Sequence, residues 1–479
     1  MSLPALSFDF AALRQAYASG EIRPTDVVHE IYRRIDADDD HHIWLHVVSR
    51  ERALAQAAAI ETLRAHGASL PLFGLPYGVK DNIDVAGLAT TAACTAFERH
   101  PTEDATVVAR LNAAGALFIG KQNMDQFATG LVGTRNLTGH CRNALSAAHV
   151  PGGSSSGSAV AVAKGHVAFS IGSDTGGSGR VPAACNNIVG LKPTPGRIST
   201  AGFVYCNRTF DVAPVFALTV DDAYDVFDVL ADKPDLRDAY LRLPGEALPR
   251  DVDLPSEQPL RVGVIDDTQL EFFGDTQAQR QYARAIEHLR ALGATLVPVD
   301  FTVFREAGEL VFGSALVAER TLAYGDTARR FPDAVHPVVR NVLEAASHYD
   351  APDAWHALYR LRELQAEAAH VFASASISLL AIPTCGTLPT CADIEANPVE
   401  GNARMGRYTY FANPLRLPVI SVPAGLRDDG LPFGLSLVGQ PDTDTQLRTL
   451  AVRLHARCAA RLGATAHPWP RERDSASIC

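Results

Sequence analysis

The sequence predicts an α/β fold in which one large sheet is covered by helices. In the first third of the chain, amphipathic helical segments alternate with short apolar strands, a pattern typical of α/β sheets. The last third of the 479 residues returns to buried strands, so a single sheet assembled from both ends of the chain is expected, rather than two domains. No period of 20 to 50 residues repeats, which argues against a solenoid.

The N-terminal third opens with two helices, and Pro24 stands at the start of the second. The apolar stripe of that second helix consists of Val27, Val28, Ile31 and Ile35. A third helix follows over 50–66, and the next apolar segment is a strand that ends at Lys80. Asp104 is expected to cap a helix that Gly115 closes, and 116–119 form the next strand.

The middle of the chain interrupts this alternation. Five prolines fall within 232–260, which we interpret as a surface connection because a strand resumes at 261–265. A mostly helical block covers about 275–376, with one strand at 294–299 inside it. The remaining strands are expected at 377–382, 419–423 and 433–438, before a closing helix with Leu447, Leu450, Ala451 and Leu454 on one face.

Composition favours a small-molecule partner. The net charge of −11 is opposite to the positive charge expected of a protein that binds nucleic acid or an anionic membrane. The eight cysteines contain no Cys-x-x-Cys pair, which argues against a zinc site and a disulfide framework, so a cytoplasmic location is expected. The first residues show no basic region followed by an apolar core, so no signal peptide is expected, and no apolar run reaches the roughly 18 residues of a membrane span.

Glycine and serine are concentrated in two clusters, 152–158 and 172–180. The glycines allow positive φ angles and close approach of the backbone to a ligand, and the serines add hydroxyl groups. A phosphate loop would need a Lys followed by Ser or Thr after the glycines, and Lys164 is instead followed by Gly165 and His166. A nucleophile site is the better interpretation. Ser155 sits in a Gly-x-Ser-x-Gly pattern, but Pro151 precedes the cluster where a strand should be.

The second cluster is better placed for a nucleophile. A strand over 167–171 leads into the turn Thr175-Gly176-Gly177-Ser178, which is followed by a short helix. Successive N–H groups at such a turn favour negative charge, so the turn has the outline of an oxyanion hole with Ser178 beside it.

A serine hydroxyl needs a base to become a nucleophile. His140, His149 and His166 lie near the clusters in sequence, but none has an obvious orienting acid, and solvated or core histidines are the simpler interpretation. Lys80 ends an apolar strand, where burial would disfavour its charge and make it a possible base. By position alone, a lysine that extends from a strand end into solvent is also possible.

Three blocks of the sequence, taken in order, resemble the amidase signature family. They are Gly78-Val79-Lys80-Asp81-Asn82, Gly152-Gly153-Ser154-Ser155 and Gly172-Ser173-Asp174-Thr175-Gly176-Gly177-Ser178. The serines 154 and 178 also have the family's spacing. Blocks at 187–193, 423–425 and 430–434 extend the resemblance over most of the chain. It implies the family's fold, a single mixed sheet covered by helices, with 1–479 as one domain and a variable helical specificity region at about 261–376.

The resemblance also implies roles for individual residues. Ser178 is the implied nucleophile, Ser154 the bridging serine on a cis peptide, and Lys80 the base, in a triad that hydrolyses amide C–N bonds through an acyl-enzyme without metal or cofactor. The implied oxyanion donors are the N–H groups of Thr175, Gly176 and Gly177. Asp174 and Arg180 are expected to form a supporting ion pair.

The segments 125–135, 154–163 and 184–190 are most similar to the allophanate hydrolase branch of the family. That similarity implies substrate contacts at Arg320, Phe312 and Gly130, although the branch carries a Tyr where this chain has Phe312. A small anionic ureide such as allophanate or a related N-acyl urea is the expected substrate, while a surface charge is the alternative for Arg320. Arg404, Arg407 and Tyr408 are further candidates for the pocket.

Three alternatives to a ureide hydrolase remain open at this point. A general small-amide amidase and a glutamine-hydrolysing amidotransferase subunit share the same chemistry. A non-catalytic binding protein is disfavoured because it has no need of Lys80, Ser154 and Ser178 together. A homodimer is expected from the family.

Overall fold

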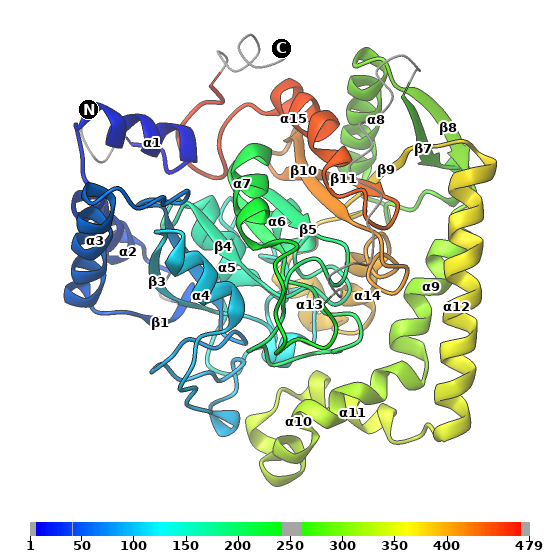
Figure 1. Ribbon diagram of the computed structural model, residues 1–479. Coiled ribbons are helices and arrows are strands. Elements are labelled where there is room, and N and C mark those ends of the chain that lie inside the picture. Colours follow the sequence, from blue (N-terminus) through cyan, green and yellow to red (C-terminus); the bar gives the residue numbers. More distant parts are fainter. Residues whose placement is uncertain (1–5, 41, 242–259, 471–479) are drawn as a thin grey trace.

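One mixed sheet of 11 strands organises the computed structural model, which describes residues 6–40, 42–241 and 260–470 (Figure 1). The strands are β1 (Trp44–Val47), β2 (Pro76–Lys80), β3 (Leu117–Gln122), β4 (Phe169–Ile171), β5 (Val189–Lys192), β6 (Val215–Ala217), β7 (Arg261–Ile265), β8 (Thr295–Val299), β9 (Leu379–Pro383), β10 (Val419–Leu426) and β11 (Pro432–Gly439). Their order across the sheet is β1-β3-β2-β4-β6-β5-β10-β11-β9-β7-β8. The α/β class and the single mixed sheet built from both ends of the chain are confirmed.

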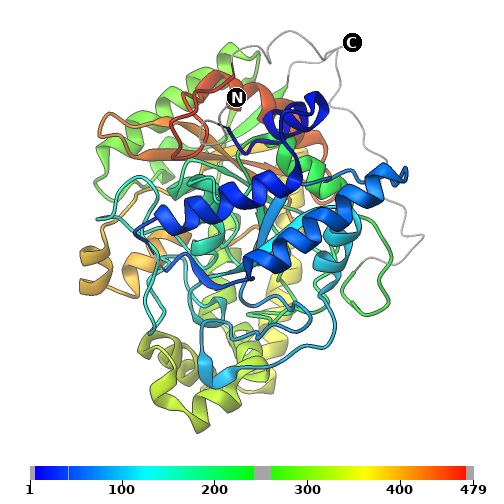
Figure 2. The same cartoon turned by 90° about the vertical axis from the view of Figure 1, so that its left-hand side faces the viewer.

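Helices cover this sheet. They are α1 (Phe10–Ser19), α2 (Pro24–Ala37), α3 (Arg50–Ala65), α4 (Thr106–Ala113), α5 (Ser156–Ala163), α6 (Val181–Cys185), α7 (Val220–Leu230), α8 (Thr276–Ala291), α9 (Thr302–Gly313), α10 (Glu319–Arg330), α11 (Pro337–Ala346), α12 (Ala351–Ser374), α13 (Cys391–Ala396), α14 (Glu400–Gly406) and α15 (Gln446–Cys458). The helices α2 and α3 lie side by side on the outside of the N-terminal part (Figure 2).

The sheet combines parallel and antiparallel pairs. The strands β2, β3 and β4 are parallel, as are β7, β8 and β9, whereas β5, β6, β10 and β11 make antiparallel pairs. Because β2 and β4 are parallel neighbours, their carboxyl ends open at the same edge of the sheet. Lys80 and the second Gly/Ser cluster are therefore brought to one place.

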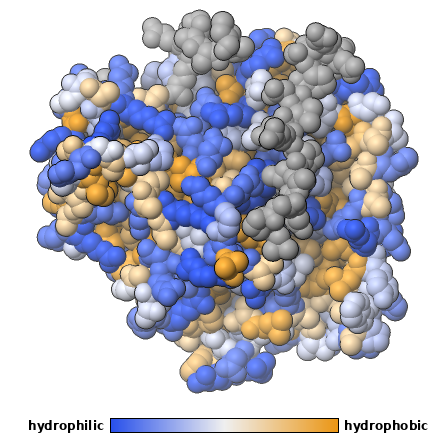
Figure 3. Space-filling view, in the orientation of Figure 1, coloured by the Kyte–Doolittle hydropathy of each residue, from blue (hydrophilic) through white to orange (hydrophobic). Residues whose placement is uncertain are grey.

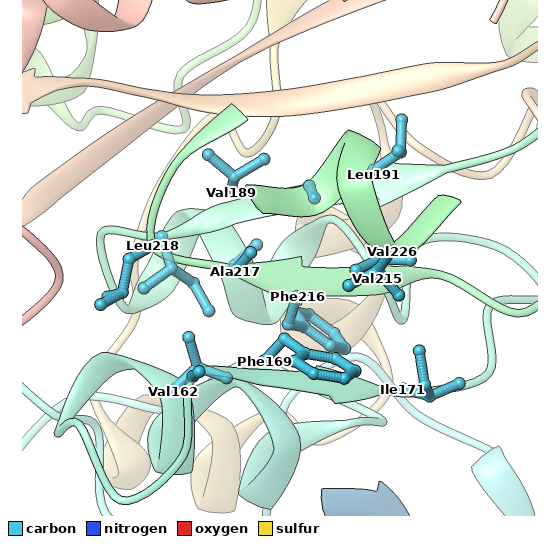
Figure 4. Packing of buried hydrophobic residues seen from close by; sticks show 14 of the residues in the cluster. Val162, Phe169, Ile171, Val189, Leu191, Val215, Phe216, Ala217, Leu218 and Val226 are labelled. Atoms are coloured by element: carbon cyan, nitrogen blue, oxygen red, sulfur yellow. The ribbon is translucent and has the colours of Figure 1, made fainter. Parts of the chain in front are cut away.

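The centre of the sheet is enclosed on both faces. The helix α5 is buried along its whole length because its sequence is built from small residues and valines, and it contacts β2, β3 and β4. The helix α7 packs on β5 and β6 (Figure 4). Thr219 caps its N-terminus, because the Thr219 side chain accepts a hydrogen bond from the Asp222 N–H. Burial of these apolar surfaces is the main force that holds in place the edge of the sheet where β2 and β4 end.

The helices α9 to α12 lie at the right and bottom of Figure 1, where α9 and α12 pack on the β7–β9 part of the sheet and α10 and α11 pack on loops of the N-terminal half. Exposed large apolar side chains are concentrated in this part of the chain: Phe312, Leu322, Phe331, Trp355, Leu358 and Tyr359. The face in Figure 3 is otherwise mostly hydrophilic, with apolar residues in small patches. Within the described residues, the helices are all too short or too polar to cross a membrane.

Several local expectations need correction. The Asp104 side chain does not cap α4: Ala105 occupies the cap position, and Asp104 accepts the N–H of Ala86 at 2.8 Å instead. Gly115 does follow that helix with a φ of 85°. The strands β1, β5 and β6 were not anticipated, because each has only three or four residues and shows no period in its sequence. The predicted surface connection at 232–260 lies largely outside the described residues.

Candidate active site

The site is built where β2 and β4 end. Lys80 is the last residue of β2, and the turn that carries Ser178 follows β4. Ser154 lies between them in a loop that leads directly into α5. Parallel pairing of β2 with β4 therefore places the lysine and both serines together, although Lys80 and Ser178 are far apart in sequence.

Lys80, Ser154 and Ser178 form one continuous hydrogen-bonded chain. The Lys80 Nζ donates to Ser154 Oγ at 2.7 Å, and Ser154 Oγ donates to Ser178 Oγ at 2.9 Å. The peptide bond between Gly153 and Ser154 is cis, as the resemblance implies. All three side chains are buried. Because hydroxyl protons rotate freely, the same two contacts can carry a proton from Ser178 towards a neutral Lys80.

Burial disfavours the charge of Lys80. The side chain is fully buried, which lowers its pKa to about 8, while the nearby carboxylate of Asp211 opposes that shift. Lys80 also donates to Ser173 Oγ at 2.9 Å, and Asn82 donates to the same hydroxyl at 3.0 Å. The lysine is thus held in one position and is partly neutral near physiological pH. It does not extend into solvent.

The loop at 125–135 supports Ser154, a structural role that its sequence did not indicate. Asp125 accepts the N–H groups of Gly133 at 3.0 Å and Arg135 at 2.8 Å, and its own N–H donates to the Ser154 carbonyl at 3.0 Å. A Cβ at Gly153 would come within 2.1 Å of the Asp125 carboxylate, so only glycine fits there. The segment 125–135 therefore positions the bridging serine.

The Ser178 turn is supported from beneath by an ion pair. Arg180 binds Asp174 through two contacts of 2.8 and 3.0 Å, and both side chains are buried. Although burial acts to raise it, the Arg180 guanidinium holds the pKa of Asp174 below its usual value. Arg180 also donates to the Thr409 carbonyl at 2.7 Å and to Asn413 Oδ1 at 2.8 Å. The expected ion pair is thus present and ties the turn to the segment before β10.

Removal of Arg180 is expected to destabilise the protein strongly. Arg180→Met leaves the Asp174 carboxylate buried without its counter-ion, which should cost about 3–5 kcal/mol in the free energy of unfolding. Equilibrium urea denaturation measures this loss. The double variant Arg180→Met/Asp174→Asn should recover part of it. Arg404→Met, which breaks the exposed pair with Glu400, should change stability by less than about 1 kcal/mol. Equal losses at Arg180 and Arg404 would contradict the structural role.

The N–H groups of the turn differ from the expectation at one position. The Gly177 N–H donates to Asp174 Oδ1 at 2.8 Å, so it is already engaged and is not free for an oxyanion. The N–H groups of Thr175, Gly176 and Ser178 have no hydrogen-bond partner among the described residues. Gly177 is required for a different reason: its φ is 145°, and a Cβ would lie 2.4 Å from the Thr409 hydroxyl.

Asp211 is a second acidic residue that the sequence analysis missed. Its carboxylate accepts the hydroxyl of Thr175 and the N–H groups of Cys206 at 2.7 Å and Asn207 at 3.2 Å. Burial raises its pKa to about 6. Asp211 therefore fixes the first residue of the turn and contributes negative potential at Lys80.

Arg320 lies inside the protein and not on its surface. Its side chain is fully buried beside the Cys206 thiol, and Nε and both Nη atoms have no oxygen or nitrogen partner and no ion pair among the described residues. The guanidinium lies 5.0 Å from the centre of the Phe312 ring. Because a buried guanidinium without an ion pair is costly, the arrangement indicates a site for an anion. The alternative of a solvated helix charge is wrong.

Phe312 lies beside the Ser178 turn, and Gly130 lies in the loop that Asp125 holds. Phe312 is 37 % exposed, and a Cβ at Gly176 would lie 3.2 Å from its ring. Gly130 is partly exposed and packs on the Asp125 carboxylate. Tyr408 bonds instead to the backbone of Glu271, and Arg407 lines a separate hollow together with Glu271. Arg404 pairs with Glu400 on the surface.

The other candidates for nucleophile and base lie outside the relay. The Ser155 hydroxyl donates to the Ser173 carbonyl at 3.2 Å, and no strand precedes its loop. His166 contacts Asp38 at 3.0 Å, and His149 contacts Ser146 at 2.8 Å. Within the described chain, no histidine hydrogen-bonds to Ser154 or Ser178.

Comparisons with known proteins agree with this geometry. The amidase family model matches residues 26–447. Urea amidolyase of Lachancea kluyveri is 41 % identical over 414 residues, which cover 86 % of this chain but 22 % of that protein. The chain therefore spans about a fifth of the length of this curated relative. A glutamyl-tRNA(Gln) amidotransferase subunit of an Exiguobacterium species is 34 % identical and is matched over 92 % of this chain and 95 % of its own.

Solved structures of amidase-type enzymes have a fold similar to that of this chain. The allophanate hydrolase of Kluyveromyces lactis superposes with a TM-score of 0.84 at 36 % identity, covering 92 % of this chain and 71 % of that one. A structure described as an amidase superposes with a TM-score of 0.81 at 29 % identity, covering 94 % and 100 %.

Proposed function

The chain belongs to the amidase family, and from this premise we propose that it is a serine amidohydrolase that cleaves a C–N bond of a small anionic ureide, such as allophanate or a related N-acyl urea. The observation that carries the chemistry is the buried relay from Lys80 through Ser154 to Ser178. The observation that favours an anionic substrate is the buried guanidinium of Arg320, which has no ion pair among the described residues.

The proposed reaction is acyl transfer to Ser178. Neutral Lys80 takes the proton of Ser178 through Ser154 as the Ser178 oxygen attacks the carbonyl carbon. The negative charge that develops on the carbonyl oxygen is stabilised by the N–H groups of Thr175, Gly176 and Ser178, which are the free donors of the turn. The Gly177 N–H supports this turn through its hydrogen bond to Asp174 and therefore does not bind the oxyanion.

The second half of the reaction uses the same groups in reverse. Collapse of the tetrahedral intermediate breaks the C–N bond, and the proton held by Lys80 returns through Ser154 to the leaving nitrogen. Water then attacks the acyl-enzyme, gives its proton to the relay, and releases the acid and free Ser178. Each step needs only groups that the chain and water supply.

Arg320 is proposed to bind the anionic end of the substrate. Its planar guanidinium suits a carboxylate through two parallel N–H donors. Arg320→Gln should therefore lower kcat/KM for a carboxylated ureide by about 10²–10³-fold, because it removes the partner of a buried charge. Hydrolysis of a neutral aliphatic amide should change little. Arg404→Gln, which removes an exposed and ion-paired guanidinium, is the matched control.

Ammonia release from allophanate, biuret, ureido acids, glutamine and a plain amide tests the proposal. Preference for the carboxylated ureides that is lost in Arg320→Gln would support it. Turnover of only the plain amide would leave a general amidase, with Arg320 in a structural role.

A glutamine-hydrolysing subunit is the second candidate function. The match to the amidotransferase subunit over nearly its whole length favours it, and glutamine also carries a carboxylate that Arg320 could bind. Glutaminase activity without turnover of ureides would establish this alternative. A homodimer remains a proposal as well, and light scattering of the purified protein would test it.

A further inference from the structure

A second aromatic ring borders the site beside Phe312. The rings of Phe312 and Tyr410 are 4.3 Å apart between centres and tilted by 48°. Both approach the Ser178 turn, since a Cβ at Gly176 would lie 2.9 Å from Tyr410 Cδ1 and 3.2 Å from Phe312 Cε2. Tyr410 therefore stands next to one of the free N–H donors and forms one wall of the space that a substrate must enter.

The ring of Tyr410 is held in a defined position. It packs flat on Gly406, where an added Cβ would lie 2.0 Å from Cζ, and its Cβ packs on Gly308. Part of the residue remains open to solvent, like Phe312 and Gly130. Tyr410 is thus held in place and half-buried beside the Ser178 turn, the combination expected of a side chain that contacts a ligand.

The Tyr410 hydroxyl has a proton to donate. Its oxygen accepts the Asn402 side-chain N–H at 2.9 Å, whereas its own O–H reaches only the Asn402 carbonyl, at 3.4 Å. Asn402 Oδ1 in turn accepts the N–H of Leu131 at 2.7 Å, which places this pair beside Gly130. Burial raises the pKa of Tyr410 to about 12 although the charges of Arg135 and Arg320 oppose it, so the phenol keeps its proton.

We propose that Tyr410 is a specificity-determining residue whose hydroxyl donates a hydrogen bond to the anionic end of the substrate that Arg320 binds. The inference rests on the proposed function and extends it to a residue with no assigned role. The Phe312 ring, which contacts both Arg320 and Tyr410, has no hydroxyl and offers only an apolar surface. A carboxylate can accept several hydrogen bonds, so it can bind a guanidinium and a neighbouring phenol at the same time.

The direct test is Tyr410→Phe, which removes one oxygen and keeps the ring. It should lower kcat/KM for the carboxylated ureide by about 10–100-fold, the usual effect of losing a hydrogen bond to a charged group. Hydrolysis of a neutral amide by the same variant, and its melting temperature, should stay close to those of the unmodified protein. Equal losses on the anionic and neutral substrates would show that the hydroxyl only supports the loop at Asn402, and would overturn the inference.

A transplanted hydroxyl gives a second, independent readout. In the Tyr410→Phe background, Phe312→Tyr places a phenol on the neighbouring ring, and it should restore part of the lost preference for the anionic substrate. Binding of the carboxylated ureide to Ser178→Ala, with and without Tyr410→Phe, separates affinity from chemistry by calorimetry. Unchanged affinity in that pair would also overturn the inference.

The outcomes distinguish this inference from the proposed function. If the unmodified protein does not prefer anionic ureides, the proposed substrate class fails, whatever Tyr410 does. If it does prefer them and loses that preference in Arg320→Gln but not in Tyr410→Phe, the substrate class stands and the role of Tyr410 is refuted.

Discussion

Replacing Ser178 with alanine is expected to abolish turnover of every substrate, by about 10⁴–10⁶-fold in kcat, because no acyl-enzyme can form without the nucleophile. The Ser178 hydroxyl is buried and hydrogen-bonded to Ser154, so its loss also removes the group whose proton the relay carries to Lys80. Ammonia release under saturating substrate measures the effect. The residual rate would come from the binding site and the N–H donors alone.

Two other serines serve as controls for Ser178. The Ser158 hydroxyl is buried without a hydrogen-bond partner among the described residues, so Ser158→Ala should leave activity and stability nearly unchanged. Ser155→Ala tests the competing Gly-x-Ser-x-Gly pattern and should retain most activity. Mass spectrometry after rapid quenching should find the acyl group on the peptide that contains Ser178. An acyl group on Ser155, or full activity of Ser178→Ala, would refute the assigned nucleophile.

The fold could be predicted because the signals were local. Apolar periodicity and turn residues in the segments around β2, β3 and β10 sufficed to place these strands. Strands at both ends of the chain predicted a single sheet, the family resemblance implied that this sheet is mixed, and the structure confirms both. The short strand β1 could not be predicted, because its pairing with β3 depends on tertiary contacts.

The candidate site could be predicted only in part from residues. The Gly/Ser clusters pointed to a nucleophile, but Lys80 was singled out by resemblance, since only the fold brings it within 2.7 Å of Ser154. Asp125 and Asp211 were missed for the same reason. Each acts through backbone N–H groups or a hydroxyl that lies next to it only after folding. The hydrogen bond from the Gly177 N–H to Asp174 could not be predicted either, because the turn motif alone does not say which of its N–H groups are free.

Tyr410 shows the limit of motif reasoning most clearly. The neighbouring Arg407 and Tyr408 were considered for the pocket, but they contact the region of Glu271 instead. Which side of this segment meets the site depends on the close packing of Tyr410 on Gly406, and no spacing in the sequence encodes that contact.

Lys80→Met is expected to lower kcat/KM by about 10²–10⁴-fold, because it removes the base while keeping an unbranched side chain in the same space. In the unmodified protein, activity should depend on pH through the same residue. Burial lowers the pKa of Lys80 to about 8, and only its neutral form can accept the proton. The rate should therefore rise tenfold per pH unit below about 8 and level off above it.

Asp211 offers a way to assign that titration to Lys80. Its carboxylate is charged at the pH where Lys80 titrates, and its negative potential favours the ammonium form of the lysine. Asp211→Asn keeps the size of the side chain but removes this charge, so the pKa of Lys80 should fall and the rise in kcat/KM should move to lower pH. A profile that stays in place in Asp211→Asn, or that persists in Lys80→Met, would mean that another group sets the pH dependence. A shift to lower pH in the first variant and a flat profile in the second would identify the buried lysine as the base.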